Sequence, residues 1–411
     1  MSHDTPPASL IIPTYNRADL LRRNLAQLVG QSLDTDRFEV IVADDGSSDD
    51  TEAAVGEFRD RLRLKYHRQE DRGNRVGTAR NAGARLATAP LLIFLDTGTF
   101  VGRDFVDAHL RAHREVPGRW AIVGYTYGYD PEGVDAGLMR QLDESTPDEL
   151  VERAGATLRD VRHAHLAAHE FDLSRLLVPY QNFFTLNCSV AAADFAAVGG
   201  FDEDFVGWGF EDLELAYRLL RDGVGLRMSR TAWAIESPHP RDPARFDELL
   251  RNMDRFFAKH PSPPLEVGWV LLMRYRDDYW TWEDELRQVL EQTAAAQGRD
   301  VTGEIAGVLA SLPAGGSLAV LGAGDQVPPG LPAAVLYDLD VNAVARLAAA
   351  EPGRHDVRHG IGLRTTLEDG AVDDVIVTSR LDGLWKRWGA DLLAEAGRIG
   401  KRVHVTATAA R

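Results

Sequence analysis

Residues 9–17 have the sequence SLIIPTYNR, in which a short apolar run ends in a proline and a group of polar side chains. An amphipathic pattern follows over about 18–29, and a second apolar run covers about 38–43. Two apolar runs separated by an amphipathic segment are typical of a β-α-β unit in a parallel sheet. This stretch therefore predicts an α/β fold, with the polar residues 14–17 at the carboxyl end of the first strand.

The same alternation continues along the first half of the chain. It predicts strands near 62–67, 91–95 and 184–191, and helices after 49–51 and over about 76–87, 211–222 and 246–259. Four strands with crossover helices favour a sheet of the nucleotide-binding kind. Residues 125–180 lose the alternation, and we expect an insertion or lid there.

The C-terminal part has a pattern of its own. Apolar runs at 317–321, 334–337 and 374–378 predict a smaller Rossmann-like domain. We therefore expect three parts: a first domain over 1–260 that includes the insertion, a helical aromatic-rich linker over 261–300, and the Rossmann-like domain over 301–411.

Composition restricts the class of protein. The 411 residues include 46 Lys and Arg against 63 Asp and Glu, a formal net charge of −17. This charge repels nucleic acid and anionic lipid. The single cysteine, Cys188, cannot form an intrachain disulfide and is compatible with the cytoplasm. A polar beginning and a short first apolar run lead us to expect no secretory signal and a cytoplasmic protein.

Acidic or polar residues follow three of the predicted strands, at 13–17, 44–47 and 96–98. Ligands of open parallel sheets bind beyond the carboxyl ends of the strands. A single Asp-Gly sequence usually marks only a turn. Three such ends at one edge of a sheet instead predict a crevice that binds a nucleotide or a divalent cation.

Basic residues are concentrated between the second and fourth predicted strands, at Arg68, Arg72, Arg75 and Arg80. They lie near the predicted start of the helix at about 76. A helix N-terminus combined with guanidinium groups favours a diphosphate. The alternative is a solvated face that carries charges by chance.

Taken together, these segments resemble a known family. SLIIPTYNR (9–17), VADDGSSD (42–49), ARNAG (79–83), FLD (94–96), NCS (187–189), VGGFDE (198–203) and GWGFEDLEL (207–215) occur in the order found in glycosyltransferase family 2. The last segments resemble the acceptor-side motif of its galactosyltransferase-like members. The resemblance covers about residues 8–240 and implies the GT-A fold. The C-terminal part has a separate resemblance, to a shortened methyltransferase-type Rossmann unit.

On the donor side, the resemblance implies that Pro13, Tyr15 and Asp45 line the nucleoside pocket and that Asp45 accepts a hydrogen bond from the base. Arg80 would face the diphosphate. Asp96 would contact the ribose and a metal ion.

On the acceptor side, Asp212 matches the family's general base. Glu211 would form a hydrogen bond to the acceptor or the sugar and would not act as a second base. Trp208 would pack on a sugar or acceptor face, and Asn187 would belong to the acceptor site. Independently of the family, attack on an anomeric carbon needs a carboxylate that takes the acceptor's proton. Without the motif, a carboxylate at this helix start would be explained by the helix dipole alone.

The metal site departs from the family pattern. Gly98 stands where the family has the second acid of its Asp-x-Asp motif. His239 follows the Glu211–Asp212 pair at a spacing where related enzymes often place a metal-binding histidine. Asp96, His239 and diphosphate oxygens could together hold Mn²⁺ or Mg²⁺.

The sequence thus predicts an inverting glycosyltransferase that moves a sugar from a nucleotide diphosphate sugar to a soluble acceptor, either a small molecule or a peptide. A soluble saccharide chain is the alternative acceptor. Two other functions stay open. One is an S-adenosylmethionine-dependent methyltransferase that would use Gly322, Gly324 and Asp338 or Asp340, and the other is a nucleotide-sugar-binding protein without catalysis.

Overall fold

The computed structural model describes residues 5–128, 136–238, 245–276 and 279–406. The chain divides into two compact units, Met1–Asn252 and Met253–Arg411. Each unit has its own sheet, and each is described by itself.

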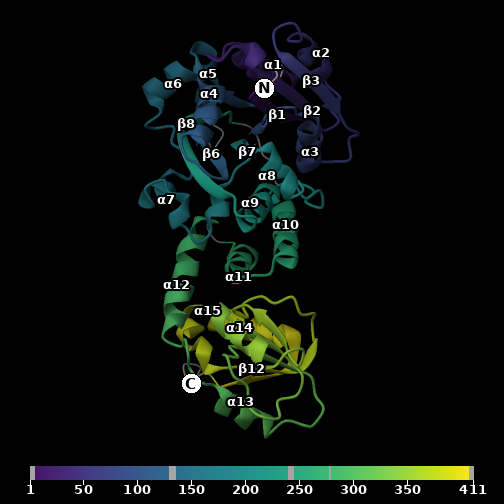
Figure 1. Ribbon diagram of the computed structural model, residues 1–411, viewed down its shortest axis with the longest axis vertical. Helices are drawn as coiled ribbons and strands as arrows, with labels where there is room; N and C mark the ends of the chain where they lie inside the picture. The colour runs from purple at the N-terminus through teal and green to yellow at the C-terminus, as the bar shows by residue number, and fades with distance from the viewer. Residues whose placement is uncertain (1–4, 129–135, 239–244, 277–278, 407–411) are drawn as a thin grey trace. The chain divides into compact units, whose positions relative to one another are not determined.

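A β-sheet forms the centre of the described part of the first unit (Figure 1). It has eight strands in the order β3-β2-β1-β4-β7-β6-β8-β5. Its strands are β1 (Ala8–Thr14), β2 (Phe38–Asp44), β3 (Arg63–Arg68), β4 (Leu91–Leu95), β5 (Thr99–Val101), β6 (Trp120–Tyr127), β7 (Asn187–Ala191) and β8 (Gly225–Glu236). The first four strands are parallel, whereas β7 runs antiparallel to both neighbours. The α/β fold is confirmed, but β5, β6 and β8 were not predicted.

The apolar runs of the sequence are explained by burial on both faces of this sheet. All seven residues of β1 are buried between its two parallel neighbours, as is typical of central parallel strands. Helix α1 (Ala18–Val29) places Leu21, Leu25 and Leu28 in the same core. Their spacing of three to four residues gives one apolar face.

Further helices complete the first unit, and α10 extends into the second. They are α2 (Thr51–Gly56), α3 (Val76–Leu86), α4 (Phe105–Arg114), α5 (Ala136–Glu144), α6 (Pro147–Ala154), α7 (His163–Ala168), α8 (Ala192–Ala197), α9 (Glu211–Arg221) and α10 (Arg245–Lys259). Helices α5, α6 and α7 occupy the expected insertion. A fully buried ion pair within this insertion joins Arg162 to Asp160 at 2.6 Å, and Arg162 also donates to the Gly124 carbonyl of β6 at 3.0 Å.

The second unit contains a five-stranded parallel sheet in the order β11-β10-β9-β12-β13. Its strands are β9 (Leu318–Leu321), β10 (Ala334–Asp338), β11 (Asp356–His359), β12 (Val372–Val377) and β13 (Gly400–Val405). Its helices are α11 (Pro263–Val270), α12 (Trp282–Ala294), α13 (Thr302–Leu309), α14 (Val341–Ala350) and α15 (Trp385–Ile399). The Glu266 carboxylate of α11 accepts backbone N–H groups of Ile361 and Gly362 at 2.9 and 2.8 Å, so this part of the expected linker is bonded to the loop that follows β11.

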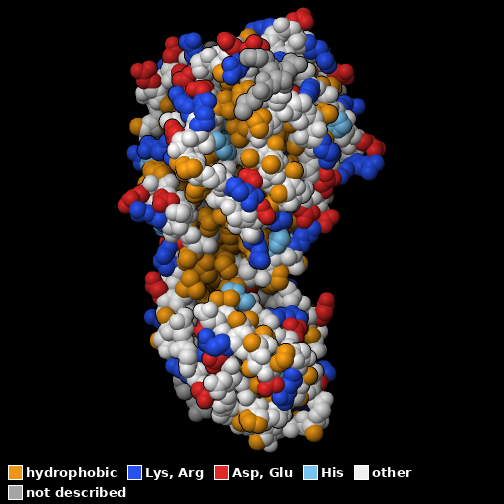
Figure 2. All heavy atoms as spheres, in the orientation of Figure 1, with side chains coloured by type: hydrophobic (Ala, Val, Ile, Leu, Met, Phe, Trp, Pro, Cys, Tyr) orange, Lys and Arg blue, Asp and Glu red, His pale blue; other side chains and the backbone are white. Residues whose placement is uncertain are grey.

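Figure 2 shows Lys and Arg side chains interspersed with Asp and Glu over the visible face. Many of these charges form surface ion pairs, such as Arg22 with Glu57 at 2.9 Å. Among the described residues, no helix has both the length and the apolar character needed to cross a membrane.

Candidate active site

Asp44 shapes the turn at the carboxyl end of β2. Its Oδ1 accepts the N–H groups of Gly46 and Ser47 at 3.1 and 2.7 Å, and its Oδ2 accepts the Tyr66 hydroxyl at 2.6 Å. Gly46 has a φ of +97°, and a Cβ there would lie 2.5 Å from the backbone nitrogen of Asp71. Only glycine fits this turn, which fixes the direction of the neighbouring Asp45.

The Asp45 carboxylate is 6% exposed and lies at the predicted nucleoside side of the site. Its Oδ2 accepts the Arg75 backbone N–H at 2.7 Å, and its Oδ1 accepts the Gln69 side-chain amide. Burial raises the pKa of Asp45 above its ordinary value, while these two donors oppose the rise. Tyr15 is 45% exposed, and its hydroxyl donates to Asp71 Oδ2 at 3.0 Å.

Asn16 joins the loops that follow β1 and β2. Its side-chain oxygen accepts the Ser48 N–H at 2.7 Å, and its backbone N–H donates to Ser47 Oγ at 2.9 Å. The loop after β4 is joined as well, because Thr97 Oγ1 donates to the Pro13 carbonyl at 2.8 Å. The three strand ends therefore lie together at one edge of the sheet, as their sequence pattern predicted.

Arg80, on helix α3, joins two acids from distant parts of the chain. Its guanidinium is buried, with Nη2 2.8 Å from Asp96 Oδ1 and Nη1 3.1 Å from Glu211 Oε1. Burial tends to lower the pKa of Arg80, but the charges of Asp96 and Glu211 raise it above its ordinary value. Arg80 therefore stays charged and holds the end of β4 against the start of α9.

Asp212 lies beside this ion-paired group in the first turn of α9. Its carboxylate accepts the Leu213 N–H at 2.9 Å and a backbone N–H of Thr185. Burial and then the adjacent Glu211 raise the pKa of Asp212 well above its ordinary value, while Arg80 lowers it. Asp212 is thus a carboxylate that is poised to hold a proton.

The two predicted acceptor residues occupy different environments. Trp208 is 39% exposed, and the Arg245 guanidinium lies 4.9 Å from its ring centroid. Asn187 is only 1% exposed, and its side chain donates to the Ala232 carbonyl at 3.0 Å and lies 3.0 Å from His109 Nε2. Trp208 can contact a ligand directly, whereas Asn187 supports β7 from within the sheet.

The residues around the predicted metal site fit a cation only in part. Asp96 keeps about a third of its side chain exposed (35%) although one oxygen contacts Arg80. Gly98 has a φ of +92°, and a Cβ there would lie 2.9 Å from Ser237 Oγ and 3.9 Å from Arg17 Nη1. Position 98 therefore offers no ligand and little space for one. His239 lies outside the described residues, and those that are described contain no group of three or more metal-ligating side chains.

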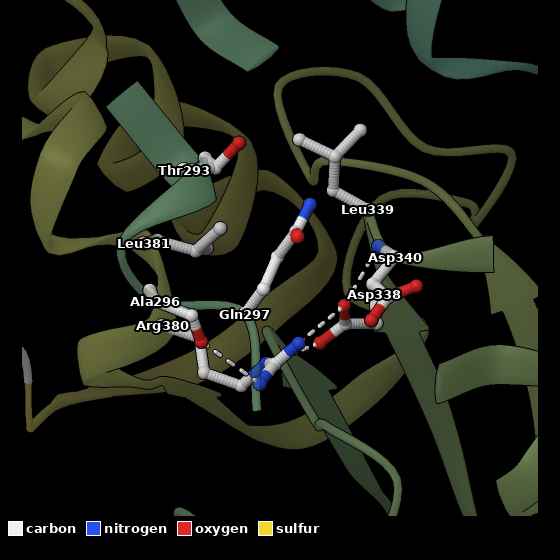
Figure 3. Close-up of a pocket in the computed structure, with 8 residues that line it drawn as sticks. All are labelled: Thr293, Ala296, Gln297, Asp338, Leu339, Asp340, Arg380 and Leu381. Atoms are coloured by element: carbon white, nitrogen blue, oxygen red, sulfur yellow. Dashed lines mark hydrogen bonds and ion pairs between the residues drawn. The ribbon is translucent and has the colours of Figure 1, made fainter. Parts of the chain in front are cut away.

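A second candidate site lies in the second unit, at the carboxyl end of β10 (Figure 3). Asp338 and Arg380 form a buried, two-point ion pair with Nε–Oδ2 and Nη2–Oδ1 distances of 2.8 and 3.0 Å. Asp338 also accepts the Gly324 N–H at 2.8 Å. Asp338, one of the two acids predicted to bind a cofactor ribose, is thus engaged within the protein. The other, Asp340, accepts the Asn342 N–H at 2.9 Å at the start of α14.

Comparison with known proteins places relatives along this chain. Residues 9–158 match the model of glycosyl transferase family 2, and residues 162–239 match the N-terminal domain of galactosyltransferase. Validoxylamine A glucosyltransferase from Streptomyces hygroscopicus subsp. limoneus is 43% identical over 97% of this chain and 90% of that protein. The protein of the same description from S. hygroscopicus subsp. jinggangensis is also 43% identical, over 97% of this chain and 96% of that protein.

Other matches are more distant. The glycosyltransferase YfnE of Bacillus subtilis is 31% identical over 60% of this chain and 68% of its own length. A solved structure of the mannosyltransferase PcManGT from Pyrobaculum calidifontis has 19% identity and a TM-score of 0.45, covering 75% of this chain and 80% of that one.

The relatives and the fold define an α/β sugar transferase. The chain belongs to glycosyl transferase family 2, as the resemblance of its motifs predicted. It is a glycosyltransferase, which favours the main prediction over both alternatives.

Proposed function

We propose that the enzyme transfers a sugar with inversion from a nucleotide diphosphate sugar to a hydroxyl of a small molecule, with Asp212 as the general base. The arrangement of three acids around one cation supports this role. Arg80 pairs with Asp96 and Glu211, whereas Asp212 has no ion pair among the described residues. Its raised pKa suits a group that must accept a proton near neutral pH.

The chemistry is a single displacement. Asp212 removes the proton of the acceptor hydroxyl as its oxygen attacks the anomeric carbon. The bond from that carbon to the diphosphate breaks on the opposite face, and the electron pair leaves with the nucleotide diphosphate. Glu211, held by Arg80, accepts a hydrogen bond from acceptor or sugar, and the exposed Trp208 ring packs against the same ligand.

On the donor side, Pro13, Tyr15 and Asp45 bind the nucleoside, and Asp96 binds the ribose. Arg80 contributes positive charge toward the diphosphate from its position beside Asp96. Asn187 is assigned to the acceptor side as a support of β7, because its side chain is buried and bonded within the sheet. Two relatives that match along nearly their whole length are described as validoxylamine A glucosyltransferases, which favours glucose as the sugar and validoxylamine A, or a compound like it, as the acceptor.

A divalent cation, Mn²⁺ or Mg²⁺, would be held by the exposed oxygen of Asp96, by diphosphate oxygens and by His239. Bound there, it would neutralise charge on the leaving diphosphate. With Gly98 supplying no ligand, binding is expected to be weak. Activity should fall in excess chelator and return with added Mn²⁺ or Mg²⁺; full activity in chelator would reject this part of the proposal.

We propose that the second unit is a Rossmann-like domain of methyltransferase type with a structural or acceptor-docking role. Its parallel strand order supports the fold, and the Arg380–Asp338 pair argues against cofactor binding. The domain limits of 1–260, 261–300 and 301–411 and the cytoplasmic location stay predictions. Cys188 is buried, and as the single cysteine it is compatible with that location.

The Asp212→Asn variant tests the assignment. Purified enzyme is supplied with UDP-, GDP- or dTDP-glucose and validoxylamine A, and product is measured by mass spectrometry. Turnover should fall by about 10²- to 10⁴-fold, the usual contribution of a general base, while donor binding is retained. Near-normal turnover by the variant would show that another group is the base. A wild-type protein that binds a donor but transfers nothing would support the non-catalytic alternative.

A further inference from the structure

The loop immediately before Asp212 has a backbone that requires external support. Residues 206–210, called the acceptor loop below, have φ values of +84° at Gly207, +95° at Gly209 and +71° at Phe210. This left-handed region disfavours residues with a Cβ, and Phe210 has one. Contacts from outside the loop must therefore stabilise this conformation.

Two side chains of helix α10 bond to the backbone of the acceptor loop. Glu248 Oε2 accepts the Trp208 N–H at 2.8 Å. Asn252 is completely buried, and its Nδ2 donates to the Gly209 carbonyl at 2.8 Å. Residues four apart share one face of a helix, so both groups approach the loop from the same side.

Helix α10 also packs directly on the two glycines of the loop. A Cβ at Gly207 would lie 2.7 Å from Glu248 Cδ, and a Cβ at Gly209 would lie 2.6 Å from Leu249 Cδ1. The backbone of the loop and the side chains of the helix are therefore in close contact. A change in the Glu248 side chain would be transmitted to the loop directly.

The other side of the acceptor loop is bonded to the donor pocket. Gly207 donates its N–H to the Asn74 carbonyl at 2.9 Å. The next residue, Arg75, donates its own N–H to Asp45 Oδ2 at 2.7 Å. The loop thus lies between α10 and the segment that contacts the proposed base-binding carboxylate.

We propose that Glu248 is a positioning residue for the acceptor, because it fixes the backbone of Trp208 and, through it, the indole ring and the start of α9. The inference rests on the proposed function, in which Trp208 contacts the acceptor and Asp212 is the base. Glu248 itself touches neither the sugar nor the reacting atoms. Its removal should therefore weaken acceptor use more than donor use.

The test compares Glu248→Ala, Glu248→Gln and Asp247→Ala with the wild type in steady-state kinetics, with UDP-glucose and validoxylamine A as probes. Asp247 is an exposed acid on the same helix and serves as the matched control. For Glu248→Ala we expect a rise of about tenfold in the acceptor KM, the effect of losing one charge-assisted hydrogen bond. The donor KM should stay within about twofold. Glu248→Gln keeps an accepting oxygen and should recover most of the loss.

Thermal unfolding shows whether each variant is folded. If Glu248→Ala does not fold, Glu248→Asp is measured in its place. The shorter side chain keeps the charge but moves the carboxylate away from the Trp208 N–H. An acceptor KM within about twofold of the wild-type value in a folded variant would overturn the inference, as would an equal rise in both KM values. Absence of transfer by the wild type would overturn the proposed function and, with it, this inference.

Discussion

Arg80 Nη1 lies 3.1 Å from Glu211 Oε1, so a buried ion pair joins helix α3 to the first residue of α9. The same guanidinium contacts Asp96, and Asp212 is the next residue after Glu211. One positive charge therefore faces three acids. The consequence is that Asp212 ionises less readily than an ordinary carboxyl, and its protonation depends on Arg80.

The first prediction concerns the pH dependence of the wild-type enzyme. A general base must be deprotonated, and burial together with Glu211 raises the pKa of Asp212. The acidic limb of kcat/KM should therefore lie well above the pH of about 4 at which an ordinary carboxyl titrates. A pH profile of kcat/KM measures this. A limb near pH 4 would contradict the assignment.

Replacement of Arg80 by Met should move that limb to still higher pH. The guanidinium lowers the pKa of Asp212, so its removal leaves the base protonated over a wider range. The substitution also leaves Glu211 and Asp96 without their cationic partner. We expect it to lower the free energy of unfolding by about 3 kcal/mol. This is the lower end of the range for breaking a buried ion pair, because Asp96 is partly exposed.

The control is Arg85→Met, since Arg85 lies on the same helix but is exposed and 3.9 Å from its acid partner. Its pH profile and its melting temperature should match the wild type within error. A limb that stays in place in folded Arg80→Met would show that the ion pair does not tune the base. Arg80→Lys is the alternative if the Met variant does not fold.

Local patterns predicted the parallel half of the first sheet because each of its segments carries its own signal. Leu21, Leu25 and Leu28 mark the buried face of α1, and the predicted range 18–29 equals the observed helix. The strand predicted from Phe184 begins only at Asn187. The centroid of the Phe184 ring instead lies 4.7 Å from Cζ of Arg162. This tertiary contact overrides the preference of Phe184 for a strand.

Candidate site residues could be identified from the sequence where they follow a predicted strand or belong to a motif, as Asp45 and Asp96 do. What no local pattern contains is the pairing of Arg80 with Glu211, which are 131 positions apart. Thr185, whose backbone N–H reaches Asp212, was missed for the same reason. Gln69, at the end of β3, could have been found, because polar residues after neighbouring strands were already the signal used.

The substitution Gly98→Asp restores the sequence of the family's metal motif but should not restore a metal site. The residue would need a φ near +92° and a Cβ 2.9 Å from Ser237 Oγ. The backbone alone should cost about 1–2 kcal/mol, and crowding adds to it. Gly223→Asp is the control, because Gly223 has a φ of +82° and open space around it.

Thermal unfolding with and without Mn²⁺ measures both effects. Gly98→Asp should melt below Gly223→Asp and should show no larger stabilisation by Mn²⁺ than the wild type. A variant that is as stable as the wild type and gains Mn²⁺ affinity would show that the site can be rebuilt by this single change.

The last prediction is that the second unit does not bind S-adenosylmethionine. Arg380 contacts both oxygens of Asp338, and a Cβ on Gly322 would lie only 3.2 Å from the Cβ of Arg380. The internal guanidinium therefore takes the partner that a cofactor ribose would need. The wild type should show no thermal shift with S-adenosylmethionine, whereas a ligand at 100 times its Kd would stabilise by about 2.7 kcal/mol.

Arg380→Ala should lower stability by about 3 kcal/mol or more because it leaves Asp338 buried and unpaired. The surface variant Arg346→Ala breaks an exposed ion pair with Asp325 and should cost about 1 kcal/mol or less. A clear thermal shift of the wild type with the cofactor would instead establish a second binding site in this glycosyltransferase.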